Sequence, residues 1–149
     1  MLQQVRKIQR DGGEANGFTL LEMLVVIVII GLLIGLVAPA VLRELGGARL
    51  SIARQSIERL GSVLDLYKLD IGSYPGTDQG LAALLEKPAG VENWNGPYLK
   101  GDKLPLDPWN HPFHYQSPSA RQGLDYDLCS GGPNNVQGTP GEAGMICNR

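Results

Sequence analysis

The chain has 149 residues and a formal net charge of −2, which suits one compact domain with an attached segment. This weakly acidic balance gives no reason to expect a nucleic-acid partner. Charged residues form 19% of the chain, against a usual share of about 25%. The deficit comes largely from one apolar run near the N-terminus.

The apolar run follows an acidic residue, Glu22, and contains no further charge before Arg43. From Met23 to Leu42 it has twenty uncharged residues, enough to cross a hydrocarbon core about 30 Å thick at about 1.5 Å per residue. Basic residues lie on both sides of the run, so charge counting leaves its membrane orientation open. By length, the run is a membrane span.

Three interpretations of this region are open. Ala38-Pro39-Ala40 matches the small-x-small pattern of a secretory cleavage site, but the run exceeds the usual apolar region of roughly 7–15 residues. A plain signal anchor explains neither Glu22 nor the residues before it. The third interpretation is a cut on the cytoplasmic side, before Phe18, which leaves the run on the mature chain. The length of the span favours this third interpretation.

The residues before the run carry a recognisable processing pattern, Gly17-Phe18-Thr19-Leu20-Leu21-Glu22. This pattern resembles the type III signal of type IV pilins and type II secretion pseudopilins. The resemblance implies that a prepilin peptidase removes residues 1–17 by cutting after Gly17, and that it methylates the new N-terminal amine of Phe18. It also implies a single-pass protein of the inner membrane with its C-terminal domain in the periplasm.

Glu22 is the unusual residue of this segment, because a carboxylate at membrane depth costs on the order of 2.5–3.5 kcal/mol. Cleavage would place the Phe18 amine on the same helical face, and the helix dipole favours an acid in the first turn by about 0.3–1 kcal/mol. The resemblance implies that Phe18, Thr19 and Glu22 serve assembly, with Glu22 meeting the amine of a neighbouring subunit. The alternative is an ordinary acid at the headgroup level, where a charge costs little.

Two glycines and a proline interrupt the apolar run. Gly31 and Gly35 form a small-xxx-small match, and Pro39 follows. Pro39 cannot donate to the Gly35 carbonyl, and its ring clashes with that turn, while each glycine weakens the helix by about 1 kcal/mol relative to alanine. The segment therefore predicts a kink or local melting. The alternative is that glycine and proline are simply common in membrane helices.

Beyond Arg43 an apolar stripe predicts that the helix continues to about Leu69. The stripe recurs at alternating steps of four and three, which is typical of a helix face packed on a core. Its members are Ala53, Ile57, Leu60, Leu64, Tyr67 and Ile71. We therefore divide the chain into a leader (1–17), a transmembrane and assembly helix (18–42) and a head that includes the rest of the helix (43–149).

The remainder of the sequence predicts a small head of α+β class. A short second helix is expected from Leu81 to Glu86. His111–Gln116 and Leu124–Cys129 are interpreted as the two antiparallel strands of a hairpin. A third short strand near Tyr98 is compatible with the pattern, and the tail from Ser130 has the composition of a loop.

Three segments of the head narrow the resemblance: SYPGTDQGLAALLEKP, LPLDPWNHPFHY and LDYDLCSGGPN. They are similar to segments of the major pseudopilins of type II secretion, with Asn110-His111 where that family has Gly-Asn. The resemblance implies a type IV pilin-like fold and the main subunit of a periplasmic pseudopilus, a homopolymer that helps export folded proteins across the outer membrane. The implied partners are minor pseudopilins, a prepilin peptidase and the inner-membrane assembly platform.

Two other functions are compatible with parts of the chain. A type IV pilin for adhesion, motility or DNA uptake shares the long helix but usually not the three head segments. A secreted binding module released at Ala40 would begin at Val41. The mass of the processed chain separates this module from either pilin-like protein.

The C-terminal loop departs from the pattern of the resembling family. Major pseudopilins typically bind calcium there, and calcium takes six to eight oxygen ligands, several of them carboxylates. Here the loop offers Asn134 and Asn135 where an aspartate is expected, and only Glu142 afterwards. In the periplasm that the resemblance implies, Cys129 and Cys147 would form a disulfide, worth about 3 kcal/mol, that takes the place of calcium. Two unpaired thiols, and residual calcium binding through Asn134 and Glu142, are the alternatives.

No pattern in the sequence predicts catalysis. His111 and His114 with the two cysteines match no usual zinc spacing, and residues three apart in a strand point to opposite faces. Asp125 and Asp127 have no accompanying nucleophile or phosphate loop and are expected to cap or brace the hairpin. We therefore expect no enzyme, no cofactor and no metal.

Overall fold

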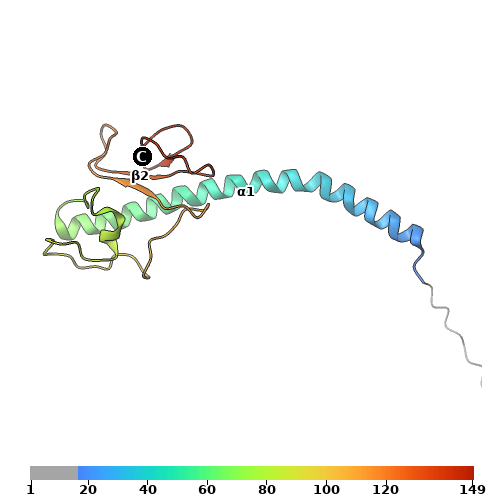
Figure 1. Cartoon of the computed structure of the whole chain (residues 1–149), viewed down its shortest axis with the longest axis horizontal. Helices are drawn as coiled ribbons and strands as arrows, with labels where there is room; N and C mark the ends of the chain where they lie inside the picture. Colours follow the sequence, from blue (N-terminus) through green and yellow to red (C-terminus); the bar gives the residue numbers. More distant parts are fainter. Residues whose placement is uncertain (1–16) are drawn as a thin grey trace, which may run out of the picture. The chain divides into compact units, whose positions relative to one another are not determined.

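The structure is a computed structural model that describes residues 17–149, and residues 1–16, which carry most of the predicted leader, lie outside the described residues. The chain divides into two compact units, one ending at Val41 and one running from Leu42 to Arg149. In chain order (Figure 1), the elements are α1 (Leu20–Ile71), the 3-10 helix η1 (Gly80–Leu84), β1 (His114–Gln116), β2 (Asp127–Ser130) and β3 (Ile146–Cys147). The predicted α+β class is confirmed.

The first element, α1, is one helix of 52 residues. It ends two residues later than predicted, at Ile71. The next residue, Gly72, has a φ of +92°, which residues other than glycine rarely adopt. The Gly72 amide donates to the Lys68 carbonyl at 2.7 Å and so satisfies one of the last carbonyls of the helix. Gly31, Gly35 and Pro39 all lie inside α1, and the kink at these residues stays a prediction.

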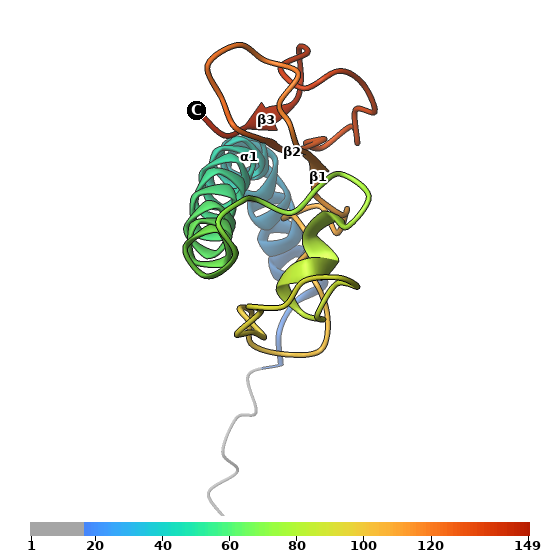
Figure 2. The ribbon, with the colours of Figure 1, turned by 90° about the vertical axis from the view of Figure 1, so that its left-hand side faces the viewer.

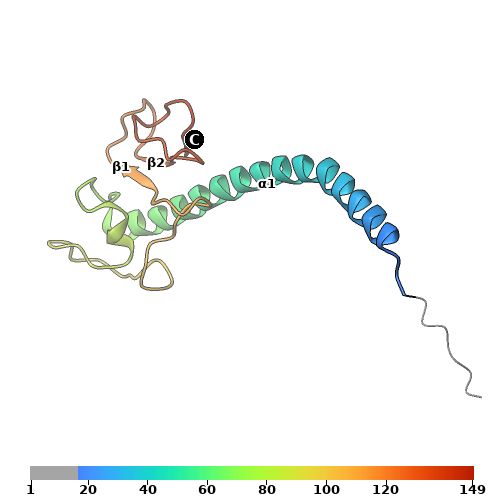
Figure 3. The ribbon, with the colours of Figure 1, turned by 45° about the vertical axis from the view of Figure 1, so that its right-hand side comes forward.

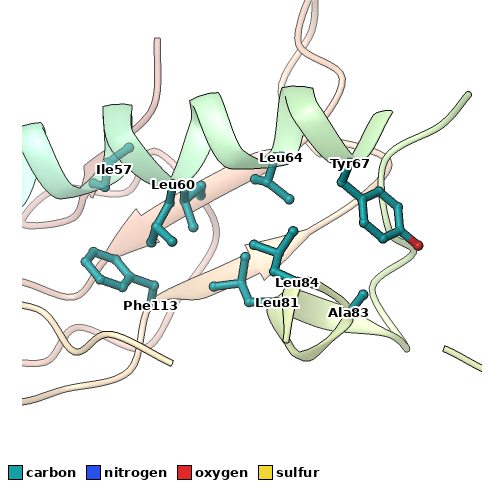
Figure 4. Packing of buried hydrophobic residues seen from close by; sticks show 9 residues of the cluster. Ile57, Leu60, Leu64, Tyr67, Leu81, Ala83, Leu84 and Phe113 are labelled. Atoms are coloured by element: carbon teal, nitrogen blue, oxygen red, sulfur yellow. The ribbon is translucent and has the colours of Figure 1, made fainter. Parts of the chain in front are cut away.

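The core of the head forms where the predicted stripe of α1 packs on η1 and the sheet (Figure 4). Five of the six stripe residues are buried, and Ile71 is half-buried. The core cluster consists of Ile57, Leu60, Leu64, Tyr67, Leu81, Ala83, Leu84, Phe113 and Leu128. The stripe therefore predicted the core face of α1 correctly. The side chain of Arg54 and that of Glu58 are exposed, as expected for the other faces.

The sheet has three antiparallel strands in the order β1-β2-β3. Figures 2 and 3 show β1 and β2 beside the C-terminal part of α1. The predicted hairpin is confirmed with shorter strands, but the third strand near Tyr98 is wrong. The Tyr98 amide donates to the carbonyl of Leu84 at 2.8 Å, so this segment is held by η1. The third strand is instead β3, in the tail that the sequence predicted to be a loop.

The predicted second helix is shorter and tighter than expected. It is the 3-10 helix η1, Gly80–Leu84, and not a helix from Leu81 to Glu86. Gly80 has a φ of +58°, and the Trp94 indole Nε1 donates to the carbonyl of Ala83 at 2.8 Å. An outside donor thus satisfies a carbonyl of this short element, which packs Leu84 into the core.

The helix α1 and the Tyr126 side chain approach each other closely at Gly61. A Cβ atom at this position would lie 2.9 Å from the hydroxyl oxygen of Tyr126, closer than real Cβ contacts. A glycine in a helix interior costs roughly 0.5–1 kcal/mol relative to alanine. Glycine at position 61 therefore makes the helix less stable but leaves space for the Tyr126 hydroxyl.

Candidate functional site

The start of α1 is fixed by Thr19, which precedes the first helical residue. The Glu22 amide donates to Thr19 Oγ1 at 3.1 Å, and the Met23 amide donates to the Thr19 carbonyl at 3.2 Å. Thr19 is therefore the N-cap, and Thr19-x-x-Glu22 has the spacing of a capping box. Sequence reasoning assigned Thr19 to assembly only, although the capping pattern was visible in the residue order.

No residue in the N-terminal part of the described chain is buried. Every residue from Gly17 to Arg49 is exposed, and the Phe18 side chain is 75% exposed. α1 is long and apolar enough to cross a membrane by length and composition. A continuous apolar surface of this size marks a membrane or protein contact. Glu22 lies on this surface, in the first turn of α1.

A disulfide closes the C-terminal loop of the head. Cys129 on β2 and Cys147 on β3 are bonded, at positions that pair directly in the sheet register. This confirms the predicted pairing, and no cysteine of the described chain is free. The bond joins residues 18 positions apart and holds β3 on the sheet.

A partly buried ion pair also holds this tail in place. Arg121 Nε donates to Asp127 Oδ1 at 2.6 Å, and the two terminal guanidinium nitrogens of Arg121 donate to the carbonyl and the side-chain oxygen of Asn148 at 2.9 and 2.6 Å. The Leu128 amide also donates to Asn148 Oδ1, at 2.8 Å. We call Arg121, Asp127 and Asn148 the tail clamp. It joins the hairpin loop, β2 and the C-terminus.

The charge of Asp127 is stabilised within this clamp. Burial raises the pKa of Asp127, but the hydrogen bonds from Arg121, Ala120 and Ser119 outweigh burial and hold the pKa below its ordinary value of 3.8. Asp127 is 1% exposed, so the carboxylate depends on these donors for its solvation. The prediction that Asp127 braces the hairpin is confirmed. Asp125 lies before β2, not on it, and pairs with Lys68 at 3.2 Å.

A second buried carboxylate, Asp107, supports the loop that enters the sheet. Asp107 Oδ1 accepts from the amides of Trp109 and His111 at 3.0 and 2.8 Å. Asp107 Oδ2 accepts from the hydroxyl of Ser130 at 2.6 Å. The carboxylate thus shapes its own turn and fixes the C-terminal end of β2. Neither the Asp107 nor the Arg121 network could be found from spacing along the chain.

The loop between β2 and β3 does not present a carboxylate cage. Glu142 Oε2 accepts from the amide of Thr139 at 3.2 Å, and Asn135 Oδ1 accepts from Gln137 Nε2 at 3.0 Å. Among residues 17–149 there is no cluster of three His, Cys, Asp or Glu side chains that could hold a metal ion. Because calcium prefers several carboxylate oxygens, this donor set does not fit it. Both cysteines are consumed by the disulfide, which leaves the zinc alternative without thiolate ligands.

The long N-terminal helix, whose second half packs on a small antiparallel sheet, defines the type IV pilin-like class. A solved structure of this class is the major pseudopilin of the type 2 secretion system of enterohaemorrhagic Escherichia coli. It aligns with a TM-score of 0.61 and 32% identity, over 72% of this chain and 91% of that chain. Residues 14–38 match the prokaryotic N-terminal methylation motif.

Residues 40–149 match the family described as type II secretion system (T2SS), protein G, and the chain belongs to that family. A relative in Pseudomonas aeruginosa, type II secretion system core protein G, is 43% identical over 84% of this chain and 88% of its own length. The protein of the same name in Vibrio cholerae is 42% identical over 87% and 90%. This family consists of structural pseudopilin subunits, and the chain is a major pseudopilin and not a type IV pilin.

Proposed function

We propose that this chain is the repeating subunit of a periplasmic pseudopilus and that the N-terminal part of α1 is its assembly surface. The observation that carries the proposal is the exposure of every residue from Gly17 to Arg49, on a helix that is apolar except for Glu22 before Arg43. Residues 18–42 hold the unassembled subunit in the inner membrane, and residues 43–149 form the periplasmic head. In the polymer, neighbouring helices replace lipid around the same surface.

The Phe18 amine and Glu22 set the register between subunits. Removal of the leader after Gly17 creates a positive charge at Phe18, next to the N-cap Thr19 that starts the helix. Stacked copies can bring the amine of one chain to the carboxylate of the next, which gives a desolvated charge an opposite partner. A copy in the wrong register leaves Glu22 unpaired in apolar surroundings, so the charge pair selects one packing.

The segment from Gly31 to Pro39 is the adaptable part of this helix. A missing amide at Pro39 and two glycines without Cβ atoms lower the cost of local bending or melting. We infer that this segment adjusts the helix when subunits move from the bilayer into the polymer. Its small residues also let neighbouring backbones approach closely.

Assembly needs partners that act on this chain. A prepilin peptidase cuts after Gly17 and methylates Phe18, and the inner-membrane assembly platform of type II secretion adds the subunit to the polymer. Minor pseudopilins form part of the same filament. The chain itself has a structural role in moving folded proteins toward the outer membrane and carries out no catalysis.

The mass of the purified protein tests processing. We expect an intact mass equal to residues 18–149 with one added methyl group, because the signal directs both steps. A chain that begins at Val41 would contradict the proposal and would identify a secreted module instead. A chain that retains residues 1–17 in a strain with the peptidase would also contradict it.

We propose further that the head is independent of calcium, because the disulfide and the tail clamp hold the loop closed. A chelator should leave the free energy of unfolding unchanged, whereas a reductant should lower it by about 3 kcal/mol. Chemical unfolding of the detergent-solubilised full chain, followed by tryptophan fluorescence, measures both effects. A measurable loss of stability in the chelator would contradict this account. The Cys129→Ala/Cys147→Ala double variant is the control, since reductant should not change its stability.

A further inference from the structure

One row of paired positions crosses the whole sheet and places a histidine beside the disulfide. His114 of β1 pairs with Cys129 of β2, which in turn pairs with Cys147 of β3. Side chains paired across antiparallel strands project from the same face, with Cβ atoms about 4.5–5.5 Å apart. We call His114, Cys129 and Cys147 the disulfide row. The imidazole is therefore the immediate cross-strand neighbour of Cys129.

The two sulfur-bearing residues of the disulfide row differ in access. Cys129, on the central strand, is 0% exposed, whereas Cys147, on the edge strand β3, is half-buried. Thiol–disulfide exchange requires an attacking sulfur to reach one particular sulfur, so its rate depends on access. Cys147 is the residue that an external reagent can reach. Cys129 can react only with its partner inside the head.

The His114 ring carries a buried nitrogen that the fold does not explain. His114 Nε2 is buried and has no hydrogen-bond partner among the described residues, which is an unfavourable state for a polar atom. The two buried carboxylates of the head are already engaged: Asp127 pairs with Arg121 at 2.6 Å, and Asp107 accepts from three donors. Cys129 is the cysteine that pairs directly with His114, so its thiol, once reduced, is the group of the row that can give a proton to this ring.

We propose that the disulfide row is a thiol–disulfide exchange site at which a disulfide oxidant enters through Cys147, with His114 as the base that accepts the proton of Cys129. The Cys147 thiolate attacks one sulfur of the oxidant, whose S–S bond breaks and releases one thiolate. The Cys129 thiol gives its proton to His114 Nε2 and then attacks Cys147 Sγ, which releases the second thiolate. Two electrons pass from the two cysteines to the two sulfurs of the oxidant. This goes beyond the proposed function and does not depend on filament assembly.

The order of attack is tested with single-thiol variants of the full chain in detergent, with oxidised glutathione as the probe. Cys129→Ala leaves Cys147, and Cys147→Ala leaves Cys129. We expect the mixed disulfide to form at least about tenfold faster on Cys147, and to form at similar rates on both thiols in guanidinium chloride. Equal rates in the folded proteins would overturn the proposal. In the reduced wild-type chain, peptide mapping of the first adduct gives an independent result, and an adduct on Cys129 would also overturn it.

The role of His114 is tested by the pH dependence of ring closure, measured by mass spectrometry after the adduct has formed on Cys147. In the wild type the rate should reach half of its maximum well below the ordinary thiol pKa of about 8.5, because His114 accepts the proton. His114→Gln should move this midpoint toward about 8.5. His111→Gln is the matched control, since His111 Nδ1 is also buried without a hydrogen-bond partner among the described residues, although it lies 3.8 Å from Asp107 Oδ1, and His111 is outside the row. An unchanged midpoint in a folded His114→Gln or His114→Asn protein would overturn the role of His114.

Discussion

Glu22→Ala should abolish the polymer while leaving cleavage after Gly17 intact. The peptidase acts on the signal before assembly, so the variant should have the mass of the processed chain and remain in the inner membrane. Without the carboxylate, the Phe18 amine of an adjoining copy has no partner in the apolar packing. Shearing or detergent extraction, followed by sedimentation of crosslinked assemblies, measures the loss.

The size of the effect follows from the cost of an unpaired charge. A charge left alone at membrane depth costs on the order of 2.5–3.5 kcal/mol, and every 1.4 kcal/mol is about a tenfold change in an equilibrium constant. Each subunit addition is therefore weakened by roughly a hundredfold, which multiplies along a filament. Glu22→Gln keeps the size of the side chain and should fail as well, because the charge is what pairs.

A matched acid on the same helix provides the control. Glu44 is exposed and lies outside the uncharged run, so Glu44→Ala should assemble like the wild type. Normal filaments from Glu22→Ala would contradict the register argument, and equal failure of Glu22→Ala and Glu44→Ala would show a general effect of charge removal. A failure of cleavage in Glu22→Ala would place the role of Glu22 in recognition by the peptidase.

Asp127→Ala should destabilise the head by about 3–5 kcal/mol at neutral pH, since it leaves the partly buried Arg121 without its charge partner. Asp127 is 1% exposed and Arg121 Nε lies 2.6 Å from its carboxylate. Asp125→Ala is the matched control, because its pair with Lys68 is exposed on both sides and such pairs contribute about 0–1 kcal/mol. Chemical unfolding of the full chain, followed by the fluorescence of the two tryptophans, measures both.

The same pair predicts how stability depends on pH. The folded pKa of Asp127 is lowered, so its contribution is fully present above the unfolded value of about 3.9 and is lost as pH falls through the folded pKa. The gap in stability between the wild type and Asp127→Ala should be constant near neutral pH and should shrink below about pH 4. A gap that widens on acidification, or equal losses from Asp125→Ala and Asp127→Ala, would contradict the assigned pairing.

The parts of the fold that depend on periodicity could be predicted from the sequence. The stripe from Ala53 to Tyr67 is set by spacing along one helix, and spacing is visible in the residue order. The same is true of the hairpin, whose two strands flank a short polar loop. The disulfide was predictable because the chain has two cysteines and a family that places them in an oxidising compartment.

The tail could not be predicted, because its structure comes from contacts made at long range. β3 has two residues within a segment rich in glycine, asparagine and proline, which favours loops. It becomes a strand because Cys147 is bonded to Cys129 and because Arg121 donates to Asn148, 27 residues away. In the sequence, nothing about Arg121 indicates that it contacts Asn148. Thr19 differs, since the pattern Thr-x-x-Glu was available and its capping role was missed.

The contact between the chain end and the acid of an adjoining copy can be observed directly in the assembled polymer. A reconstruction of purified filaments by electron cryomicroscopy, at a resolution that separates side chains, would locate both groups. The account predicts that the methylated Phe18 nitrogen lies within about 4 Å of the Glu22 carboxylate of a neighbouring subunit. A Glu22 side chain that faces lipid or solvent, far from every chain end, would contradict it.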